Sequence, residues 1–307
     1  MRVVFFGTPA FAVPSLDALV AEGARIEAVV TQPDRPRGRS RSRLVPSSVK
    51  SRALELGLPL LQPERPRGDV FLANLRRLAP ELGVVVAYGH ILRPEVLAVP
   101  RLGMINVHAS LLPRHRGAAP IQAAILAGDR ETGVTIMKLD EGLDTGPILR
   151  AASTPIRAGE PAGELTERLA QLGAWTLIEA VTLLQHGELP PVPQDDAMAT
   201  LAPKLTREAA RIRWDQPADA VARQIQAYDP APGAWTATPD GELKLFGAVP
   251  VEAQGPPGQI VEPGPPLVIA AREGGVAVHE IQPAGRKRMP AEAWLRGRGR
   301  KPAPSFT

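Results

Sequence analysis

The stretch RVVFFGTPAFAVPSLDALVAEGARIEAVVT, residues 2–31, decides the fold of the N-terminal half of the chain. Its apolar run at 2–6 predicts a strand, and the run at 25–31 predicts a second one. The segment AFAVPSLDALVAEG between them predicts a helix that Gly23 can end in a left-handed conformation. A strand, a helix and a second strand in this order form the unit from which parallel sheets are built.

The same alternation continues through the first 186 residues. We expect further strands at 58–61, 81–87, 103–107 and 133–138, with helices that end near Gly57 and lie around 70–78, 118–127 and 163–186. The run LGVVVA at 82–87 has no polar side chain, which is typical of a strand buried on both faces of a sheet. The sequence therefore predicts an α/β domain with a Rossmann-like, mostly parallel sheet.

The composition changes near residue 188. The stretch LPPVPQDDAMATLAP, residues 189–203, predicts an extended linker stiffened by proline. Beyond it we expect a helix at 217–228 and short strands at 234–238, 242–251, 258–261, 267–271 and 276–281. Five strands with one helix favour a small OB-like β-barrel. We therefore predict an N-terminal domain at 1–188, a linker at 189–203 and a C-terminal barrel domain at 204–307.

The composition of the 307 residues excludes several classes of protein. Because the chain has no cysteine, disulfides and thiolate chemistry are excluded, and five histidines alone do not predict a structural zinc site. The apolar run VVFF near the start is too short for a signal-peptide core or a membrane span. We expect a cytoplasmic protein that does not contact a membrane.

The basic residues gather in two clusters. Between Arg35 and Arg52 there are seven basic residues and no acidic one, and between Arg286 and Lys301 there are seven against the single acid Glu292. Such clusters are typical of a surface that binds a phosphate backbone. Two solvated loops would have the same composition, so charge alone leaves both interpretations open.

The densest run of chemically capable residues is 88–120, in which the predicted strand at 103–107 carries Asn106 and leads directly to His108. Asn106 and His108 share one face of that strand because side chains alternate with a period of two. They lie at its carboxyl end, where open parallel sheets bind their ligands. An amide and an imidazole can both donate to an oxygen that becomes negative, as acyl transfer requires. The alternative is that both side chains only cap neighbouring backbone groups.

A second polar group stands in MKLDEGLDTGPIL, residues 137–149, where Asp140, Glu141 and Asp144 share a glycine-bracketed loop. One of these carboxylates could orient His108. Asp144 has the most constrained neighbours of the three. An Asx-type turn that satisfies only its own backbone is the alternative interpretation.

Several stretches of the sequence resemble a known family. They are FFGTPAFAVPSLDAL, AYGHIL, INVHASLLPRHRGAAPIQAAILAGD, GVTIMKLDEGLDTGPIL, APKLTREAARIRW and AYDPAPGAW. Together they closely resemble the methionyl-tRNA formyltransferase family over essentially the whole chain. Asn106, His108, the SLLP segment and Asp144 are shared by all formyltransferases that depend on 10-formyltetrahydrofolate. APKLT, PGAW and the C-terminal barrel narrow the resemblance to the branch that acts on tRNA.

The resemblance implies a formyltransferase fold and a metal-free reaction. The formyl group of the co-substrate 10-formyltetrahydrofolate would pass through a tetrahedral intermediate to the amine of initiator methionyl-tRNA, for translation initiation. Asn106 and His108 would hold the formyl oxygen, and Asp144 would position His108 and help to remove the proton of the amine. Arg116 is expected to brace its loop, and His115 to lie exposed.

The resemblance also implies two sets of binding residues in a chain that acts as a monomer. The implied folate-binding residues are Tyr88, Gly89, Ile91, Ser110, Leu111, Leu112 and Pro113. The implied tRNA-binding residues are Arg37, Arg39, Arg41 and Arg43 of the basic loop, with Arg286, Lys287 and Arg288 of the C-terminal cluster.

Other functions compete with this interpretation. The same donor with a sugar or nucleotide amine as acceptor keeps the fold and the site, and a hydrolase would put water in place of the amine. A non-catalytic tRNA-binding module would leave Asn106, His108 and Asp144 unexplained. A dinucleotide-binding oxidoreductase fails because FGTPAFA lacks the G-x-G-x-x-G spacing that a pyrophosphate needs.

Overall fold

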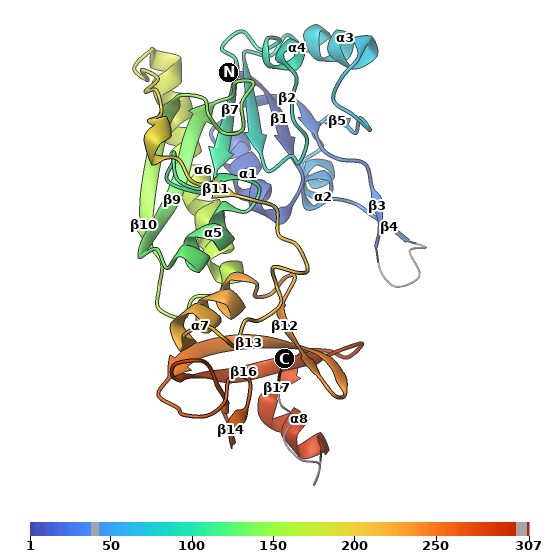
Figure 1. Cartoon of the computed structure of the whole chain (residues 1–307). Helices are drawn as coiled ribbons and strands as arrows, with labels where there is room; N and C mark the ends of the chain where they lie inside the picture. Colours follow the sequence, from blue (N-terminus) through green and yellow to red (C-terminus); the bar gives the residue numbers. More distant parts are fainter. Residues whose placement is uncertain (38–42, 299–305, 307) are drawn as a thin grey trace. The chain divides into compact units, whose positions relative to one another are not determined.

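The structure is a computed structural model that describes residues 1–37, 43–298 and 306 (Figure 1). The chain forms two compact units. The first unit comprises Met1–Gly117, Gly133–Thr154 and Thr166–Leu201. The second comprises Ala118–Thr132, Pro155–Leu165 and Ala202–Thr307. Within the described residues, no helix is long and apolar enough to cross a membrane.

A seven-stranded sheet forms the centre of the first unit. Its strand order is β10-β9-β7-β6-β1-β2-β5. The strands are β1 (Arg2–Gly7), β2 (Arg25–Val30), β5 (Leu60–Leu61), β6 (Leu82–Val86), β7 (Met104–His108), β9 (Glu131–Lys138) and β10 (Ile148–Pro155). The five strands from β5 to β7 run parallel, and β9 is antiparallel to β7. All five residues of β6 are buried, as expected for a strand covered on both faces.

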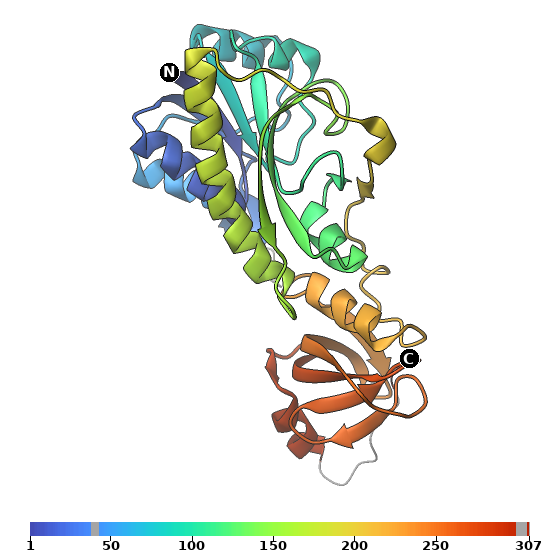
Figure 2. The same ribbon diagram turned by 90° about the vertical axis from the view of Figure 1, so that its left-hand side faces the viewer.

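Helices flank this sheet. They are η1 (Ala10–Ala12), α1 (Val13–Ala21), α2 (Ser48–Glu55), α3 (Asp69–Arg77), α4 (Pro94–Leu97) and α6 (Ala162–His186). The hydroxyl of Ser47 caps α2 by accepting from the Lys50 N–H at 3.0 Å. The long helix α6 lies along one face of the sheet (Figure 2), and a Cβ on its Gly173 would come within 3.0 Å of the Val107 side chain. A larger residue at this position would require the Val107 side chain to shift by a few tenths of an ångström.

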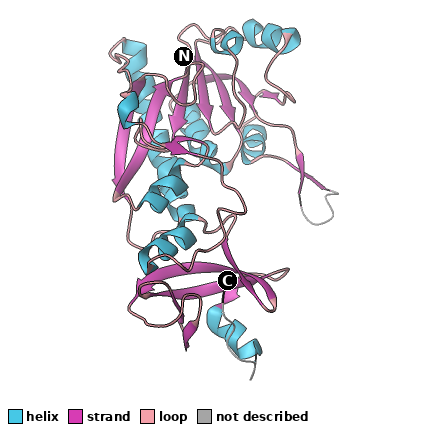
Figure 3. Cartoon of the chain, viewed as in Figure 1, coloured by secondary structure: helices cyan, strands magenta, loops and turns pink. Residues whose placement is uncertain are grey.

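The second unit is built around an antiparallel sheet (Figure 3). Its strand order is β12-β13-β16-β15-β14, with β17 paired to β16. The strands are β12 (Ala234–Thr238), β13 (Gly241–Val251), β14 (Ile260–Pro263), β15 (Leu267–Ala270), β16 (Gly275–Pro283) and β17 (Met289–Pro290), and the helices are α5 (Pro120–Ala127), α7 (Ala218–Ala227) and α8 (Ala291–Arg298). Gly128 ends α5 with a positive φ of 72°.

The predicted fold class is confirmed, because a mostly parallel sheet with helices is followed by a small antiparallel β domain. The sequence did not predict β10, α8, the short β17, or the hairpin of β3 (Arg35–Arg37) and β4 (Arg43–Val45). Seven of the eight β10 residues are at least partly exposed, so β10 lacks the buried apolar run that marks an inner strand. The short strands β8 (Arg116–Gly117) and β11 (Leu201–Ala202) pair with each other. A single 3₁₀ turn, η2 (Asp196–Met198), precedes β11.

Candidate functional site

The carboxyl end of β7 brings an imidazole next to a carboxylate. His108 is the last residue of β7, and its side chain is 5% exposed. Its Nδ1 lies 3.6 Å from Oδ2 of Asp144, whose side chain is 13% exposed. Asn106 precedes His108 by two residues on the same strand and is half-buried. Asn106 and His108 therefore share the face of β7 on which this pair lies.

A backbone carbonyl fixes the orientation of the His108 ring. Nε2 of His108 lies 3.0 Å from the carbonyl oxygen of His115. A carbonyl can only accept, so this contact assigns a hydrogen to Nε2. Nδ1 is then the ring nitrogen that faces Asp144, and it is the nitrogen that can exchange a proton with a ligand or with the carboxylate.

Asp144 is held by its own backbone and by the loop that follows β7. Its Oδ2 accepts a hydrogen bond of 2.9 Å from the Gly117 N–H. Its φ of 54° is unusual for a residue other than glycine, although aspartate tolerates it better than most. Such backbone conformations often occur at functional sites, where the surroundings enforce them.

The two other carboxylates of this loop do not share that position. Asp140 closes an Asx-type turn, because it accepts hydrogen bonds from the Gly142 N–H at 3.0 Å and from the Thr145 hydroxyl at 2.8 Å. Glu141 is exposed. Asp144 is thus the carboxylate of this loop that the structure places at His108.

The segment from Ser110 to Pro113 is fixed to β9. The Thr135 hydroxyl donates to the Ser110 carbonyl at 2.7 Å and accepts from the Leu112 N–H at 3.1 Å. The Ser110 hydroxyl donates to the Arg114 carbonyl at 2.6 Å. Leu111 packs against the backbone at Gly133, where a Cβ would come within 2.6 Å of it. The SLLP segment is therefore a rigid wall, as a surface for a flat ligand needs to be.

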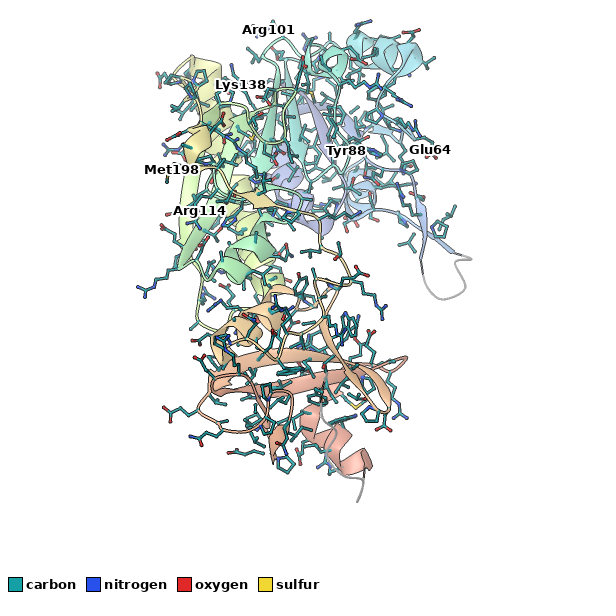
Figure 4. The ribbon with its side chains drawn as sticks, in the orientation of Figure 1. Glu64, Tyr88, Arg101, Arg114, Lys138 and Met198 are labelled. Carbon is teal, nitrogen blue, oxygen red and sulfur yellow. The ribbon has the colours of Figure 1, made fainter. Side chains whose placement is uncertain are left out.

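The residues that follow β6 have three different environments. The Tyr88 ring is 1% exposed and packs edge-on against Phe6 at 5.4 Å (Figure 4 labels Tyr88 within the first unit). Its carbonyl accepts from the Gln32 amide at 2.9 Å. Gly89 has a φ of 84°, and a Cβ there would lie 2.6 Å from Gln32 Nε2. Ile91 is 85% exposed. The Tyr88 side chain thus belongs to the core, and Ile91 to the surface.

Two buried polar atoms at this place are unpaired among the residues that the structure describes. They are the Tyr88 hydroxyl and Nε2 of His90, whose rings lie 5.5 Å apart. Buried polar atoms usually have a partner, which can be water or a ligand. A partner for either atom would have to come from water or from a bound molecule.

Replacing Tyr88 with phenylalanine is expected to make the first unit less sensitive to alkaline pH. Burial raises the pKa of Tyr88 to about 12, whereas an unfolded tyrosine titrates near 10. The wild type therefore loses stability as the pH rises from about 10 to 12, by roughly 2 kcal/mol for this group. The Tyr88→Phe variant lacks that loss, although Tyr228, whose pKa burial also raises, keeps its share.

Urea unfolding of both proteins at pH 9 and at pH 11 measures this difference. At pH 9 we expect the variant to be at least as stable as the wild type, because the unpaired hydroxyl is removed. Equal losses of stability in both proteins between the two pH values would show that Tyr88 does not titrate in a buried site.

The loop at Arg116 is braced as the sequence predicted, but His115 is not exposed. The Arg116 side chain is buried and donates to Gln194 Oε1 at 2.8 Å and to Asp196 at 2.8 Å. His115 is 6% exposed, so the prediction of an exposed position is wrong. Its N–H donates to the hydroxyl of Thr200 at 2.8 Å, and the segment that carries Thr200 covers it.

The basic loop lies only partly within the described residues. Arg37 and Arg43 belong to the paired strands β3 and β4. Arg39 and Arg41 lie outside the described residues, as do the side chains of Arg37 and Arg43. At the base of the hairpin, Arg35 donates to Gln32 Oε1 at 3.1 Å.

The three residues of the C-terminal cluster differ in their contacts. Arg286 and Lys287 are exposed. Arg288 donates to Asp229 at 2.7 Å and to Glu280 at 2.6 Å, and its guanidinium lies 4.1 Å from the Phe246 ring centroid. These contacts hold Arg288 within the second unit, and its role in binding phosphate stays a prediction.

Three polar residues around the site were not predicted from the sequence, namely Thr135, Gln194 and Thr200. Gln194 and Thr200 lie in the segment predicted as a linker, where Val192 pairs with Ile148 of β10. Polar side chains between prolines were the only signal that the segment makes specific contacts. Among the residues that the structure describes, no group of three or more His, Asp or Glu side chains could hold a metal ion.

Comparisons with known proteins identify the family of the chain. The family described as formyl transferase matches residues 1–181, and its C-terminal domain matches residues 204–299. A curated protein of Moorella thermoacetica, called methionyl-tRNA formyltransferase, is 48% identical over 97% of this chain and 96% of its own. A protein of the same name from Thiobacillus denitrificans is 48% identical and is covered to 97%.

A solved structure shares the fold. HypX from Aquifex aeolicus, in complex with tetrahydrofolic acid, has a TM-score of 0.68 and is 20% identical over 97% of this chain and 47% of its own. The two matched domains span nearly the whole sequence, and the curated relatives agree with them. The chain therefore belongs to the formyl transferase family, in its methionyl-tRNA formyltransferase branch.

Proposed function

We propose that the protein transfers the formyl group of 10-formyltetrahydrofolate to the α-amino group of initiator methionyl-tRNA. The observation that carries this proposal is the His108–Asp144 pair at the carboxyl end of β7, in a chain that matches both domains of the family. The curated relatives that bear the name of this activity supply the acceptor. The reaction would serve translation initiation in the cytoplasm, with the protein acting as a monomer.

The reaction requires the protein to position the amine next to the formyl carbon and to stabilise the negative charge that develops on the formyl oxygen. The amine nitrogen attacks the formyl carbon, the new C–N bond forms and the bond from that carbon to the folate nitrogen breaks. The amine gives up one proton, and the folate nitrogen gains one. The Asn106 amide and a protonated His108 Nδ1 would donate to the formyl oxygen while it carries negative charge. Asp144 would stabilise the charged imidazole and accept the proton of the amine.

We propose that the residues implied by the resemblance bind folate, and the structural support differs from one residue to the next. The rigid segment from Ser110 to Pro113 and the exposed apolar side chain of Ile91 fit the two faces of a flat ring. Gly89 would bring backbone groups close to the ligand, since it has no Cβ. Tyr88 would support this wall from the core, because its ring is buried and its carbonyl accepts from the Thr8 hydroxyl and the Gln32 amide.

The tRNA-binding residues are proposed from charge. The side chains of Arg37, Arg39, Arg41 and Arg43 would engage phosphates of the acceptor stem through bidentate contacts. Arg286 and Lys287 are exposed and would add contacts that do not depend on sequence. We further propose that the catalytic domain spans 1–188 and that 204–307 form the tRNA-binding domain, joined by the segment 189–203.

Transfer of labelled formyl from 10-formyltetrahydrofolate to several acceptors tests the proposal. We expect labelled formylmethionyl-tRNA to form much faster than any product from a sugar amine or a nucleotide amine. Rapid labelling of a small amine would move the protein to another branch of the family. A folded protein that binds tRNA but transfers formyl to none of these acceptors would be a binding module.

A further inference from the structure

One side chain from the segment 189–203 connects both loops that surround the catalytic pair. The Gln194 amide nitrogen donates to the Asp144 carbonyl at 2.9 Å and to the Gly146 carbonyl at 2.7 Å. Its oxygen accepts from Nε and Nη2 of Arg116, at 3.0 and 2.8 Å. Both N–H groups and both lone pairs of the amide are thus used, and this determines its position and orientation.

The partners of Gln194 are adjacent to the groups that touch His108 and Asp144. Arg116 lies between His115, whose carbonyl meets His108 Nε2, and Gly117, whose N–H donates to the Asp144 carboxylate. On the other side, Gln194 binds the backbone carbonyl of Asp144 itself. Gln194 therefore fixes the distance between the loop that orients the imidazole and the loop that carries the carboxylate.

We infer that Gln194 is a positioning residue for the proposed formyl transfer, which acts on the rate through the geometry of His108 and Asp144. The positive φ of Asp144 makes this support necessary, because its backbone conformation must be enforced by neighbours. The inference rests on the proposed function. Gln194 touches neither reacting group, so its effect should fall on kcat and leave the binding of either substrate nearly unchanged.

Only an amide of this length can make all four contacts. A glutamate would keep a partner for Arg116 but would set a carboxylate oxygen against the two carbonyls of Asp144 and Gly146. A methionine of similar size would remove all four contacts and leave the buried Arg116 with its bond to Asp196. The two substitutions therefore separate the loss of the donors from the loss of the acceptor.

Asp196 provides a matched control in the same segment. Its Oδ1 accepts from Arg116 at 2.8 Å, but its side chain is 83% exposed. An exposed ion pair contributes little. The Asp196→Ala variant keeps the bonds of Gln194 to Arg116, to Asp144 and to Gly146, so we expect its kcat to stay within about twofold of the wild type.

The experiment measures kcat and both KM values of the wild type, Gln194→Met, Gln194→Glu and Asp196→Ala, with circular dichroism to check folding. We expect both Gln194 variants to lose about 10–100-fold in kcat, with KM for folate and for methionyl-tRNA changed less than about threefold. Equal kcat in a folded Gln194 variant and the wild type would overturn the inference, and so would the same loss in Asp196→Ala.

A double substitution shows whether Gln194 acts through Asp144. If it does, Gln194→Met combined with Asp144→Asn should be no slower than Asp144→Asn alone. The carboxylate that Gln194 positions is already absent from the Asp144→Asn variant. Losses that multiply would assign Gln194 an independent structural role and overturn the inference. A wild type without transferase activity would overturn the proposed function, and this inference with it, whereas an active wild type with equally active Gln194 variants overturns the inference alone.

Discussion

Replacing His108 with alanine is expected to lower kcat of formyl transfer by about 10²–10³, which is typical of the loss of one donor to a developing oxyanion. The imidazole is the group that the His115 carbonyl and Asp144 orient at the end of β7. Without it, Asn106 alone would donate to the formyl oxygen, and Asp144 would lose its partner. Steady-state transfer to methionyl-tRNA measures the effect, and KM for both substrates should change much less than kcat.

A second histidine provides the control for this prediction. His186 lies at the exposed end of α6, so His186→Ala removes an imidazole without touching the site. We expect its kcat to equal that of the wild type. A His108→Ala variant that folds and retains full kcat would remove His108 from the reaction and leave Asn106 as the remaining donor to the formyl oxygen.

Replacing Arg288 with alanine is expected to destabilise the second unit by about 2 kcal/mol. The guanidinium pairs with Asp229, whose side chain is 6% exposed, and stacks on the Phe246 ring. Breaking a buried ion pair on one side costs about 3–5 kcal/mol, and we reduce that figure because the Arg288 side chain is 34% exposed. Urea or thermal unfolding of the second unit should show the loss as a lower midpoint.

The neighbours of Arg288 provide matched controls, since they carry the same charge without its contacts. Arg286→Ala and Lys287→Ala should leave the unfolding midpoint unchanged and raise KM for tRNA at moderate salt. A variant of Arg288 that weakens tRNA binding and keeps full stability would reverse the assignment and place Arg288 on the RNA surface.

The sequence predicted the fold well where one pattern dominates. The apolar run at 82–87 and the alternating segments of the second half correspond to β6 and to β12 through β16. It failed where pairing depends on backbone contacts with little apolar character, as in β10 and in the Arg-rich hairpin of β3 and β4. An edge strand buries few side chains, so its sequence carries little of the signal that marks an inner strand.

The candidate site could be predicted only in part. Period-two alternation placed Asn106 and His108 on one face, and the resemblance selected Asp144 among three carboxylates. The sequence could not show that Asp140 closes its own turn, or that the carbonyl of His115 fixes the His108 ring. The Gly142 N–H that closes the turn and the His115 carbonyl are backbone groups, which every residue type has, so the sequence does not indicate these contacts.

The hydrogen bonds of the segment 189–203 also affect how the protein can be shortened. The stretch Thr166–Leu201, which includes most of this segment, belongs to the first unit. Within it, Gln194 and Thr200 anchor the loop that carries Arg116 and His115. A fragment that ended at residue 188 would keep all three proposed catalytic side chains and lose the groups that hold their loops. A minimal catalytic fragment, or a fusion that grafts another RNA-binding domain onto this one, should therefore place its junction after Leu201.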